Sequence, residues 1–170
     1  MRKQQIVFPL KFKGKAALYA GGLAEALRMQ SLGPEALAAP LDAALELADL
    51  KTAAQIELPS LSFALVVFTG PSRPRLDFQH RDRLWRAFQV PVFEQFCGPD
   101  AAVVAHECEA HDGLHLAPRA GARIVDGELR IGSYATGLTA LLDTAHCECG
   151  EETPRLTVGG LFDWARQAAA

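Results

Sequence analysis

The sequence predicts a mixed α/β (α+β) fold, in which a layer of helices and strands is followed by an antiparallel β meander. Within residues 1–100, stretches with helical spacing of apolar residues alternate with short apolar runs, which is the pattern of an α/β layer. In the second half the apolar runs are shorter, and Asp112-Gly113 and Asp126-Gly127 separate some of them. Asp-Gly pairs are strong signals of β-hairpin turns, so this half is predicted to be antiparallel.

The first half is predicted to open with an edge strand and a helix. Residues 6–10 are mostly apolar, and Pro9 places them at a sheet edge because proline lacks the N–H that a central strand donates. Residues 16–30 are rich in alanine and leucine, which favours a helix. Gly21-Gly22 then marks a join between its first turn and its longer part.

A second helix and a buried strand are predicted next. Residues 34–51 carry a helical stripe of leucines, with Pro34 in the first turn, where its missing N–H costs nothing. Pro40 predicts a break or a kink in this helix. Residues 61–68 form a continuous apolar run that ends at a Gly-Pro pair, which is typical of a buried central strand.

The remaining elements follow from the same signals. Residues 77–88 have the spacing of an amphipathic helix, and residues 90–96 read as a second buried strand. Short strands are predicted over residues 101–110, 114–117, 123–125, 128–133 and 138–143, and a helix over residues 161–168. We therefore expect a single domain over residues 1–170, with an α/β half (1–100), a β-rich half (101–158) and a closing helix (159–170).

Composition excludes several classes of protein. The 170 residues are 49% hydrophobic and 22% charged, which is typical of a globular domain. A net charge of -3 gives no electrostatic footprint for nucleic acid. There is no run of eighteen apolar residues, and the apolar stretch at residues 6–10 is too short for a signal peptide. These features predict a cytoplasmic protein without a membrane span, in which cysteines stay reduced and can bind metal.

Cysteine and histidine residues indicate a metal site in the β-rich half. Cys108 and His115 lie close together in the sequence, and Cys147 and Cys149 form a Cys-x-Cys pair. Three thiolates and one imidazole are a typical ligand set for tetrahedral zinc. A Cys3His set fills the coordination shell, so the predicted zinc is structural and no catalytic residue is assigned.

The expected hairpin allows a test of which histidine completes the set. If Asp112-Gly113 is the turn, Cys108 and His115 fall on one face as diagonal neighbours. Cys147 and Cys149 share one side if their segment is extended, and Gly150 then allows a tight bend with backbone N–H groups near the thiolates. Two alternatives for the fourth ligand remain, His106 and His111. The other interpretation of the whole set is buried cysteines without a metal, which is also how Cys97 is interpreted.

The same residues resemble a known family. Residues 107–115 resemble the Glu-Cys…Gly-(Leu/Tyr)-His segment of the phenylacetate–coenzyme A ligases, which are adenylate-forming enzymes. In the same order as in that family, residues 84–96 resemble its helix-strand segment, residues 134–137 its Tyr-Arg-Thr-Gly-Asp motif and residues 147–156 its Cys-x-Cys-Gly-Arg-Thr-x-Pro-Arg stretch. The resemblance covers about residues 60–158. It implies a structural zinc held by Cys108, His115, Cys147 and Cys149.

The departures from the family concern the nucleotide. The family's phosphate loop ends in lysine, but residues 69–72 are too short and contain none. Ala135 and Leu138 stand where the family has the arginine and the ribose-binding aspartate of its motif. The fifteen residues after Arg155 are expected to leave no room for the family's C-terminal domain with its catalytic lysine. Adenylation by this chain alone is therefore not expected.

Three functional hypotheses follow. The first is a zinc-stabilised, non-catalytic accessory protein that binds a partner protein or a small acyl or aryl ligand. The second is a subunit of a split adenylate-forming acyl-CoA ligase whose ATP-binding pieces lie on another polypeptide. The third is a small-molecule sensor. The residues that would bind a small-molecule cofactor are unknown from the sequence.

Overall fold

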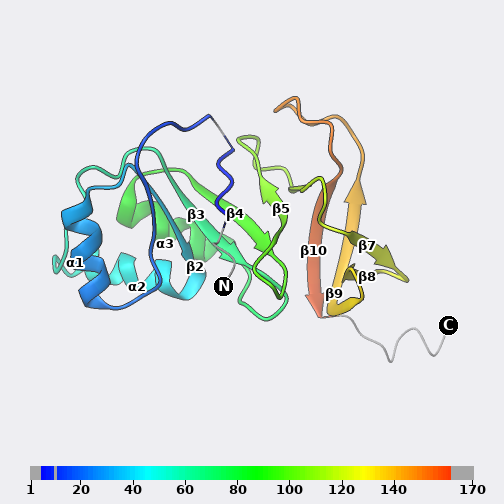
Figure 1. The fold of residues 1–170 in the computed structure, drawn as a ribbon, viewed down its shortest axis with the longest axis horizontal. Coiled ribbons are helices and arrows are strands. Elements are labelled where there is room, and N and C mark those ends of the chain that lie inside the picture. Colours follow the sequence, from blue (N-terminus) through cyan, green and yellow to red (C-terminus); the bar gives the residue numbers. More distant parts are fainter. Residues whose placement is uncertain (1–4, 10, 162–170) are drawn as a thin grey trace.

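The computed structural model describes residues 5–9 and 11–161, and these form one mixed sheet with three helices (Figure 1). The elements, in order, are β1 (Ala16–Leu18), α1 (Leu23–Leu32), β2 (Ala36–Pro40), α2 (Leu41–Thr52), β3 (Ala64–Thr69), α3 (Phe78–Phe88), β4 (Val92–Cys97), β5 (Val103–Glu107), β6 (Leu114–Leu116), β7 (Ala122–Val125), β8 (Glu128–Ile131), β9 (Tyr134–Asp143) and β10 (Arg155–Leu161). The strand order is β1-β2-β3-β4-β5-β6-β10-β9-β8-β7. The predicted mixed α/β fold is confirmed.

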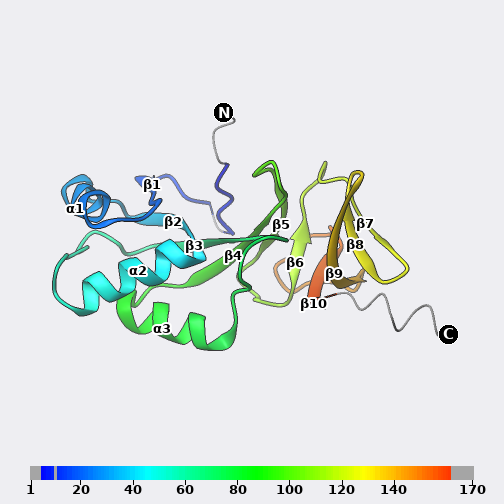
Figure 2. The same ribbon diagram turned by 90° about the horizontal axis from the view of Figure 1, so that it is seen from below.

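The first four strands are parallel, and helices connect them. Helices α2 and α3 pack against each other and cover the same face of this part of the sheet (Figure 2). The core beneath them joins the helix residues Leu47 and Leu84 to Leu65 and Val67 of β3. Every residue of β3 and of β4 is buried, as expected for parallel strands covered on both faces.

The N-terminal segment covers part of the opposite face without joining the sheet. Ile6 and Phe8 pack against a cluster that includes Phe68. The buried amide of Gln95 holds the backbone of this segment, because its Oε1 accepts from the N–H of Val7 (2.8 Å) and its Nε2 donates to the carbonyl of Gln5 (2.9 Å). The strand predicted over residues 6–10 is therefore wrong within the described part, and residue 10 lies outside it.

Two of the predicted helices each begin with a strand instead. Residues 16–18 form β1, and the chain turns at Gly21 and Gly22, where φ is 118° and 88°, before α1 begins. Residues 36–40 form β2, and Pro40 marks the junction with α2 instead of a kink inside one helix. The alanine-rich composition favours a helix locally, but the parallel pairing of β1 with β2 and of β2 with β3 decides the structure.

The second half is antiparallel, as predicted, but it contains one more strand. Asp126-Gly127 forms the expected two-residue turn, with φ of 52° and 83°, between β7 and β8. Strand β9 begins at Tyr134, four residues earlier than expected. Strand β10 was not predicted, and it pairs with both β6 and β9. Residues 159–161 belong to β10 instead of the closing helix, and residues 162–170 lie outside the described part.

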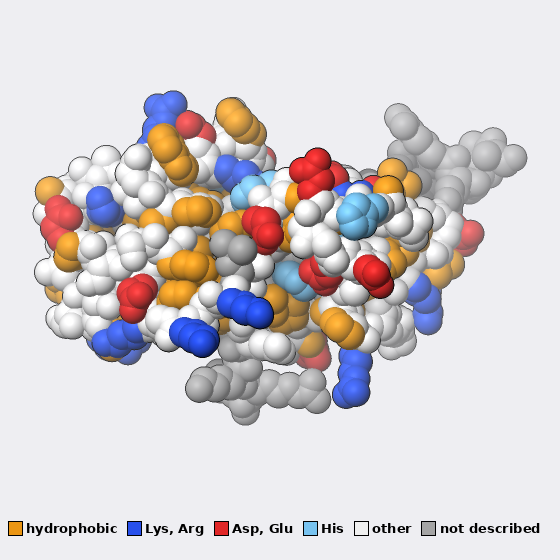
Figure 3. Space-filling model, turned by 90° about the horizontal axis from the view of Figure 1, so that it is seen from above, with side chains coloured by type: hydrophobic (Ala, Val, Ile, Leu, Met, Phe, Trp, Pro, Cys, Tyr) orange, Lys and Arg blue, Asp and Glu red, His pale blue; other side chains and the backbone are white. Residues whose placement is uncertain are grey.

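Two observations concern membrane-spanning helices and the distribution of basic side chains. Within the described residues, no helix is long and apolar enough to cross a membrane. On the face that Figure 3 shows, basic side chains are spread over the surface and do not form a stripe.

Candidate metal centre

Four side chains from three separate parts of the chain meet between the end of β5, β6 and the connection that leads from β9 to β10. Cys108 follows β5, His115 lies in the middle of β6, and Cys147 and Cys149 lie in the connection between β9 and β10. One ligand atom of each lies within 4.8 Å of the others, and all but the half-buried Cys149 are buried. These are the four residues that the sequence analysis singled out. Their role as metal ligands remains a prediction.

Two distances within the cluster are close to those expected around a tetrahedral metal ion. The sulfurs of Cys108 and Cys147 are 3.7 Å apart, and the Cys149 sulfur is 3.4 Å from Nε2 of His115. Zinc–sulfur bonds of about 2.3 Å and zinc–nitrogen bonds of about 2.0 Å at tetrahedral angles place such atoms about 3.8 Å and about 3.5 Å apart. These two distances are compatible with a single tetrahedral metal ion between the four residues.

Cys108 and His115 meet through a register different from the one predicted. In the β5–β6 pair, His106 faces His115 and Glu107 faces Leu114, whereas a two-residue turn would place Ala110 opposite His115. The connection is longer because the N–H of His111 donates to the carbonyl of Cys108 (3.1 Å), which adds a turn before the chain reverses. His111 adopts a φ of 53° in this turn, a conformation that is uncommon outside glycine.

The Cys-x-Cys segment is also a turn instead of an extended strand. The N–H of Gly150 donates to the carbonyl of Cys147 (2.9 Å), and Gly150 has a φ of 81°. The turn directs backbone N–H groups at the sulfurs, as predicted: that of Glu151 donates to the sulfur of Cys149 (3.4 Å). Such donors stabilise thiolates, which are the form that binds zinc.

The pKa values of two of the thiols shift in opposite directions. The N–H of Cys149 is the main cause that lowers the pKa of Cys147 to about 7. Burial raises the pKa of Cys108 to about 12.

His115 is oriented for coordination. Its ring is fully buried, and Nδ1 lies 3.1 Å from the carbonyl oxygen of Thr153 and 3.2 Å from that residue's hydroxyl. Donation from Nδ1–H to this carbonyl leaves Nε2 deprotonated and directed at Cys149, which is the usual arrangement around a zinc-bound histidine. The Thr153 hydroxyl in turn donates to Glu151 (2.8 Å), which holds the carbonyl in place.

The alternative histidines lie outside the cluster. His106 faces Glu151, with 3.6 Å between Nε2 and the carboxylate, and burial lowers its pKa. The ring of His111 stacks on Phe93, with centroids 4.9 Å apart and planes 4° from parallel, and its Nδ1 is 2.9 Å from Glu107. Cys97 is buried in the small hydrophobic cluster that the N-terminal segment covers, as expected for a structural cysteine.

Sequence reasoning missed one residue that supports the site. Arg155 begins β10, is only 5% exposed, and forms ion pairs with both Asp112 and Asp143. It thereby links the loop after Cys108 to the end of β9, from which the chain runs to Cys147. The only signal in the sequence was the Pro-Arg pair in the last segment that resembles the ligase family.

A second polar network lies beneath the loop that carries Cys108. Arg81 pairs with Glu107 (3.0 Å) and lies 3.7 Å from Glu94, and the hydroxyl of Thr69 donates to Glu94 (2.6 Å). Burial raises the pKa of Glu94. The network connects α3 and β4 to the start of the loop that carries Cys108, and it was not predicted.

Comparison with known proteins supports a likeness of fold. No protein-family model matches the chain, and no curated protein matches its sequence. Among solved structures, 2-hydroxyisobutyryl-CoA ligase in complex with R3-HIB-AMP matches 86% of this chain at a TM-score of 0.69 and 13% identity. The open conformation of that ligase with 2-HIB-AMP and CoA matches 82% at a TM-score of 0.65 and 16% identity.

The chain has the fold of part of an acyl-CoA ligase. The resemblance to adenylate-forming CoA ligases that the sequence indicated is therefore confirmed for the fold of this segment. The chain spans 43% and 36% of the two ligase chains, which is less than half of their length.

Proposed function

We propose that this chain is a zinc-stabilised accessory relative of the central part of an acyl-CoA ligase, which binds a partner protein or a small acyl or aryl ligand and does not itself adenylate. The observation that carries the proposal is the Cys3His cluster, two of whose distances are close to those around a tetrahedral zinc. Four protein ligands leave no open position, so the metal would be structural.

Zinc at this position would connect segments that the sheet alone holds weakly. Strand β6 has three residues, and only two residue pairs join it to β10. A zinc ion bound by Cys108, His115 and the Cys147–Cys149 turn would join the end of β5 and strand β6 to the β9–β10 connection. Because such a site is not formed in the unfolded chain, the free energy of metal binding would add directly to that of folding.

The edge where a nucleotide would be expected has little space. In open α/β sheets, ligands bind outside the carboxyl ends of the parallel strands. Here the hollow between the loops that follow β3 and β4 measures about 180 Å³, below the roughly 300–1,000 Å³ of ligand pockets. A Cβ on Gly70 would lie 2.6 Å from the carbonyl oxygen of Cys97, so the two loops are in close contact. Together with Ala135 and Leu138 in place of the family's arginine and aspartate, this supports a chain that does not bind ATP.

Three measurements test the proposal. Elemental analysis of protein purified without chelator should give about one zinc per chain. Isothermal titration with ATP-magnesium should give no binding, and no pyrophosphate should exchange into ATP when aryl acids are added. Protein without metal and with four freely reactive thiols would refute the zinc assignment. A dissociation constant in the low micromolar range for ATP would refute the accessory role.

One observation favours the split-ligase alternative, namely that the chain matches less than half of each ligase structure. In that case the ATP-binding pieces would be supplied by another polypeptide. Pyrophosphate exchange that appears only after this chain is mixed with such a polypeptide would identify it as a subunit.

A further inference from the structure

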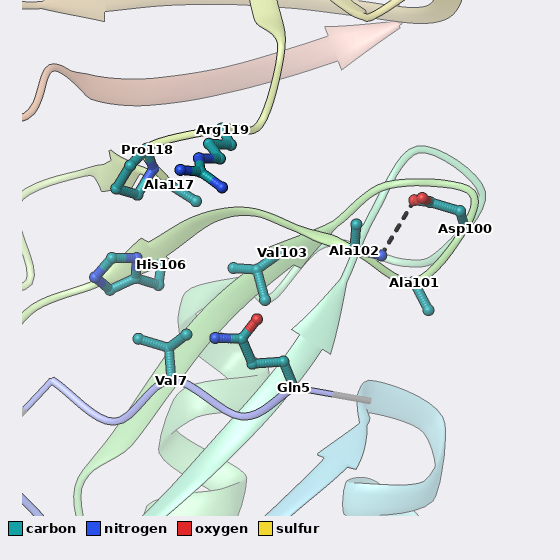
Figure 4. A pocket seen from close by; sticks show the side chains of 10 residues that line it. All are labelled: Gln5, Val7, Asp100, Ala101, Ala102, Val103, His106, Ala117, Pro118 and Arg119. Carbon is teal, nitrogen blue, oxygen red and sulfur yellow. Dashed lines mark hydrogen bonds between the residues drawn. The ribbon is translucent and has the colours of Figure 1, made fainter. Parts of the chain in front are cut away.

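A groove of about 590 Å³ runs beside α3, and we call it the α3 groove. One wall is formed by α3, and the other by the start of β4, the end of β5 and the loop that follows. The groove shares no lining residue with the cavity drawn in Figure 4, which lies between the N-terminal segment, β5 and the segment after β6. None of its lining residues belongs to the Cys3His cluster. The α3 groove is therefore a surface separate from both.

Two aromatic side chains of the α3 groove face the solvent. Phe78 is 83% exposed and Trp85 is 53% exposed. They are seven residues apart in α3, so they lie two turns apart on the same side of the helix. Single exposed apolar residues are common, but aromatic residues gathered in one groove indicate an interaction surface, because such residues supply much of the binding energy between proteins.

The charged residues between the two rings make this side of α3 complementary to itself. Arg81 and Asp82 follow Phe78 by three and four residues, so they flank the line between the rings on opposite sides. When two copies of a helix pair in parallel about a two-fold axis, equivalent residues meet at the centre, and one flank of each helix meets the opposite flank of the other. Each ring would then meet its own equivalent, and Arg81 of each copy would face Asp82 of the other.

Contacts within the chain already hold these two charged side chains in place. The guanidinium of Arg81 donates to the carbonyl of Val92 (2.9 Å) and to the carboxylate of Glu107 (3.0 Å), yet it remains partly exposed. The carboxylate of Asp82 pairs with Arg86 one turn further along the helix (3.0 Å). Because both groups are positioned before association, pairing them across an interface costs less conformational entropy.

We propose that the α3 groove is the interface of a homodimer, in which α3 of one copy lies in the groove of the other and parallel to its equivalent. The occupant is a second copy because a base and an acid between two aromatic rings match the same set on another chain. The second copy would also cover Glu107 and His111, which line the groove on either side of Cys108 in the sequence.

The size of the contact sets its strength. Helix α3 has eleven residues, which span about 16 Å. A contact centred on one short helix lies at the small end of specific interfaces, where association is weak and reversible. The dissociation constant is therefore expected in the micromolar range, at about 1–100 μM.

Sedimentation velocity of the full chain over about 1–300 μM measures the association. The wild type should pass from monomer to dimer within this range. Phe78→Ser and Trp85→Ser should each raise the dissociation constant at least about tenfold, because each removes an aromatic contact at the centre of the interface. Leu141→Ser, at a 73% exposed position on β9 outside the groove, is the matched control and should leave the constant unchanged. A wild type that stays monomeric up to about 300 μM would overturn the proposal.

A charge reversal tests the parallel arrangement. Asp82→Arg places a like charge opposite Arg81 of the other copy, so it should raise the dissociation constant at least about tenfold. Glu57→Arg reverses a charge at an exposed position outside the groove and should have no effect. Circular dichroism checks that each variant is folded, as expected for changes at the surface. Equal dissociation constants for Asp82→Arg and Glu57→Arg would overturn the arrangement.

The dimer goes beyond the proposed function and does not depend on it. A chain that stays monomeric while it holds zinc and ignores ATP would overturn the dimer alone. A chain that dimerises through α3 and also binds ATP would support the dimer and overturn the accessory role.

Discussion

His106 lies directly opposite His115 in the β5–β6 pair, yet only His115 belongs to the Cys3His cluster. The ring centroids are 6.3 Å apart. Nδ1 of His115 is held by Thr153 so that Nε2 faces Cys149, whereas Nε2 of His106 faces Glu151. The orientation that the neighbouring groups impose, and not proximity alone, separates a candidate ligand from its neighbour.

The first prediction uses this pair of histidines. His115→Ala should abolish stoichiometric zinc binding, because it removes the only nitrogen in the cluster and three thiolates leave the tetrahedral shell incomplete. His106→Ala should retain about one zinc per chain. Zinc content after dialysis against metal-free buffer checks both variants. Retention of zinc by His115→Ala together with its loss from His106→Ala would reverse the assignment.

The second prediction concerns two cysteines. Cys149→Ser should lower the free energy of unfolding by several kcal/mol, because it removes a ligand whose binding energy is coupled to folding. Cys97→Ser is the control, and it should cost at most ~1 kcal/mol, since a buried thiol is replaced by a hydroxyl of similar size. Urea unfolding of the zinc-loaded proteins measures both values. Equal destabilisation would show that Cys149 contributes no more than an ordinary buried cysteine.

The third prediction concerns Arg155. Arg155→Met should lower the free energy of unfolding, because it releases two ion pairs of the Arg155 guanidinium, whose carboxylate partners can return to water. Zinc should also be lost to a chelator faster, since the loop after Cys108 and the end of β9 are no longer linked. Asp143→Asn, which leaves the pair with Asp112, should have less than half of this effect. If Arg155→Met loses zinc to the chelator at the wild-type rate, the ion pairs of Arg155 do not support the metal site.

Local sequence predicts some elements of this fold and not others, for physical reasons. The strand around Val66 could be predicted because its residues are apolar without interruption and are buried on both faces. Strands β1 and β2 could not, because alanine and leucine favour a helix locally and only the pairing of β1 with β2 and of β2 with β3 overrides this preference. For both β1 and β2, the strand pairing that decides the structure involves residues far away in the sequence.

The candidate site shows the same division. The identity of the four residues could be predicted from chemistry, since few other functions gather three cysteines and a histidine at such spacing. The register that joins Cys108 to His115 could not, because it depends on the positive φ of His111, a residue that rarely adopts it. The double pairing of Arg155 depends in turn on β10, which has no distinctive pattern.

The last prediction concerns the pH dependence of stability and rests on Glu94. Burial raises the pKa of this carboxyl above its ordinary 4.5, so the folded state binds a proton more tightly than the unfolded state. Between pH 4.5 and the raised folded-state pKa, the folded protein therefore carries more protons, and the contribution of Glu94 to stability falls as pH rises. Above the folded-state pKa this contribution is constant.

Glu94→Gln cannot ionise and should lack the decrease, so the stability of the wild type minus that of the variant should fall as pH rises from about 5 and then level off. Urea unfolding of both proteins across this range measures the difference, in which zinc ligands and other carboxylates cancel. Glu57→Gln, at an exposed position, is the control for the change from glutamate to glutamine as such. A wild-type advantage that grows with pH would show that Arg75 and Arg81 outweigh burial and hold Glu94 ionised.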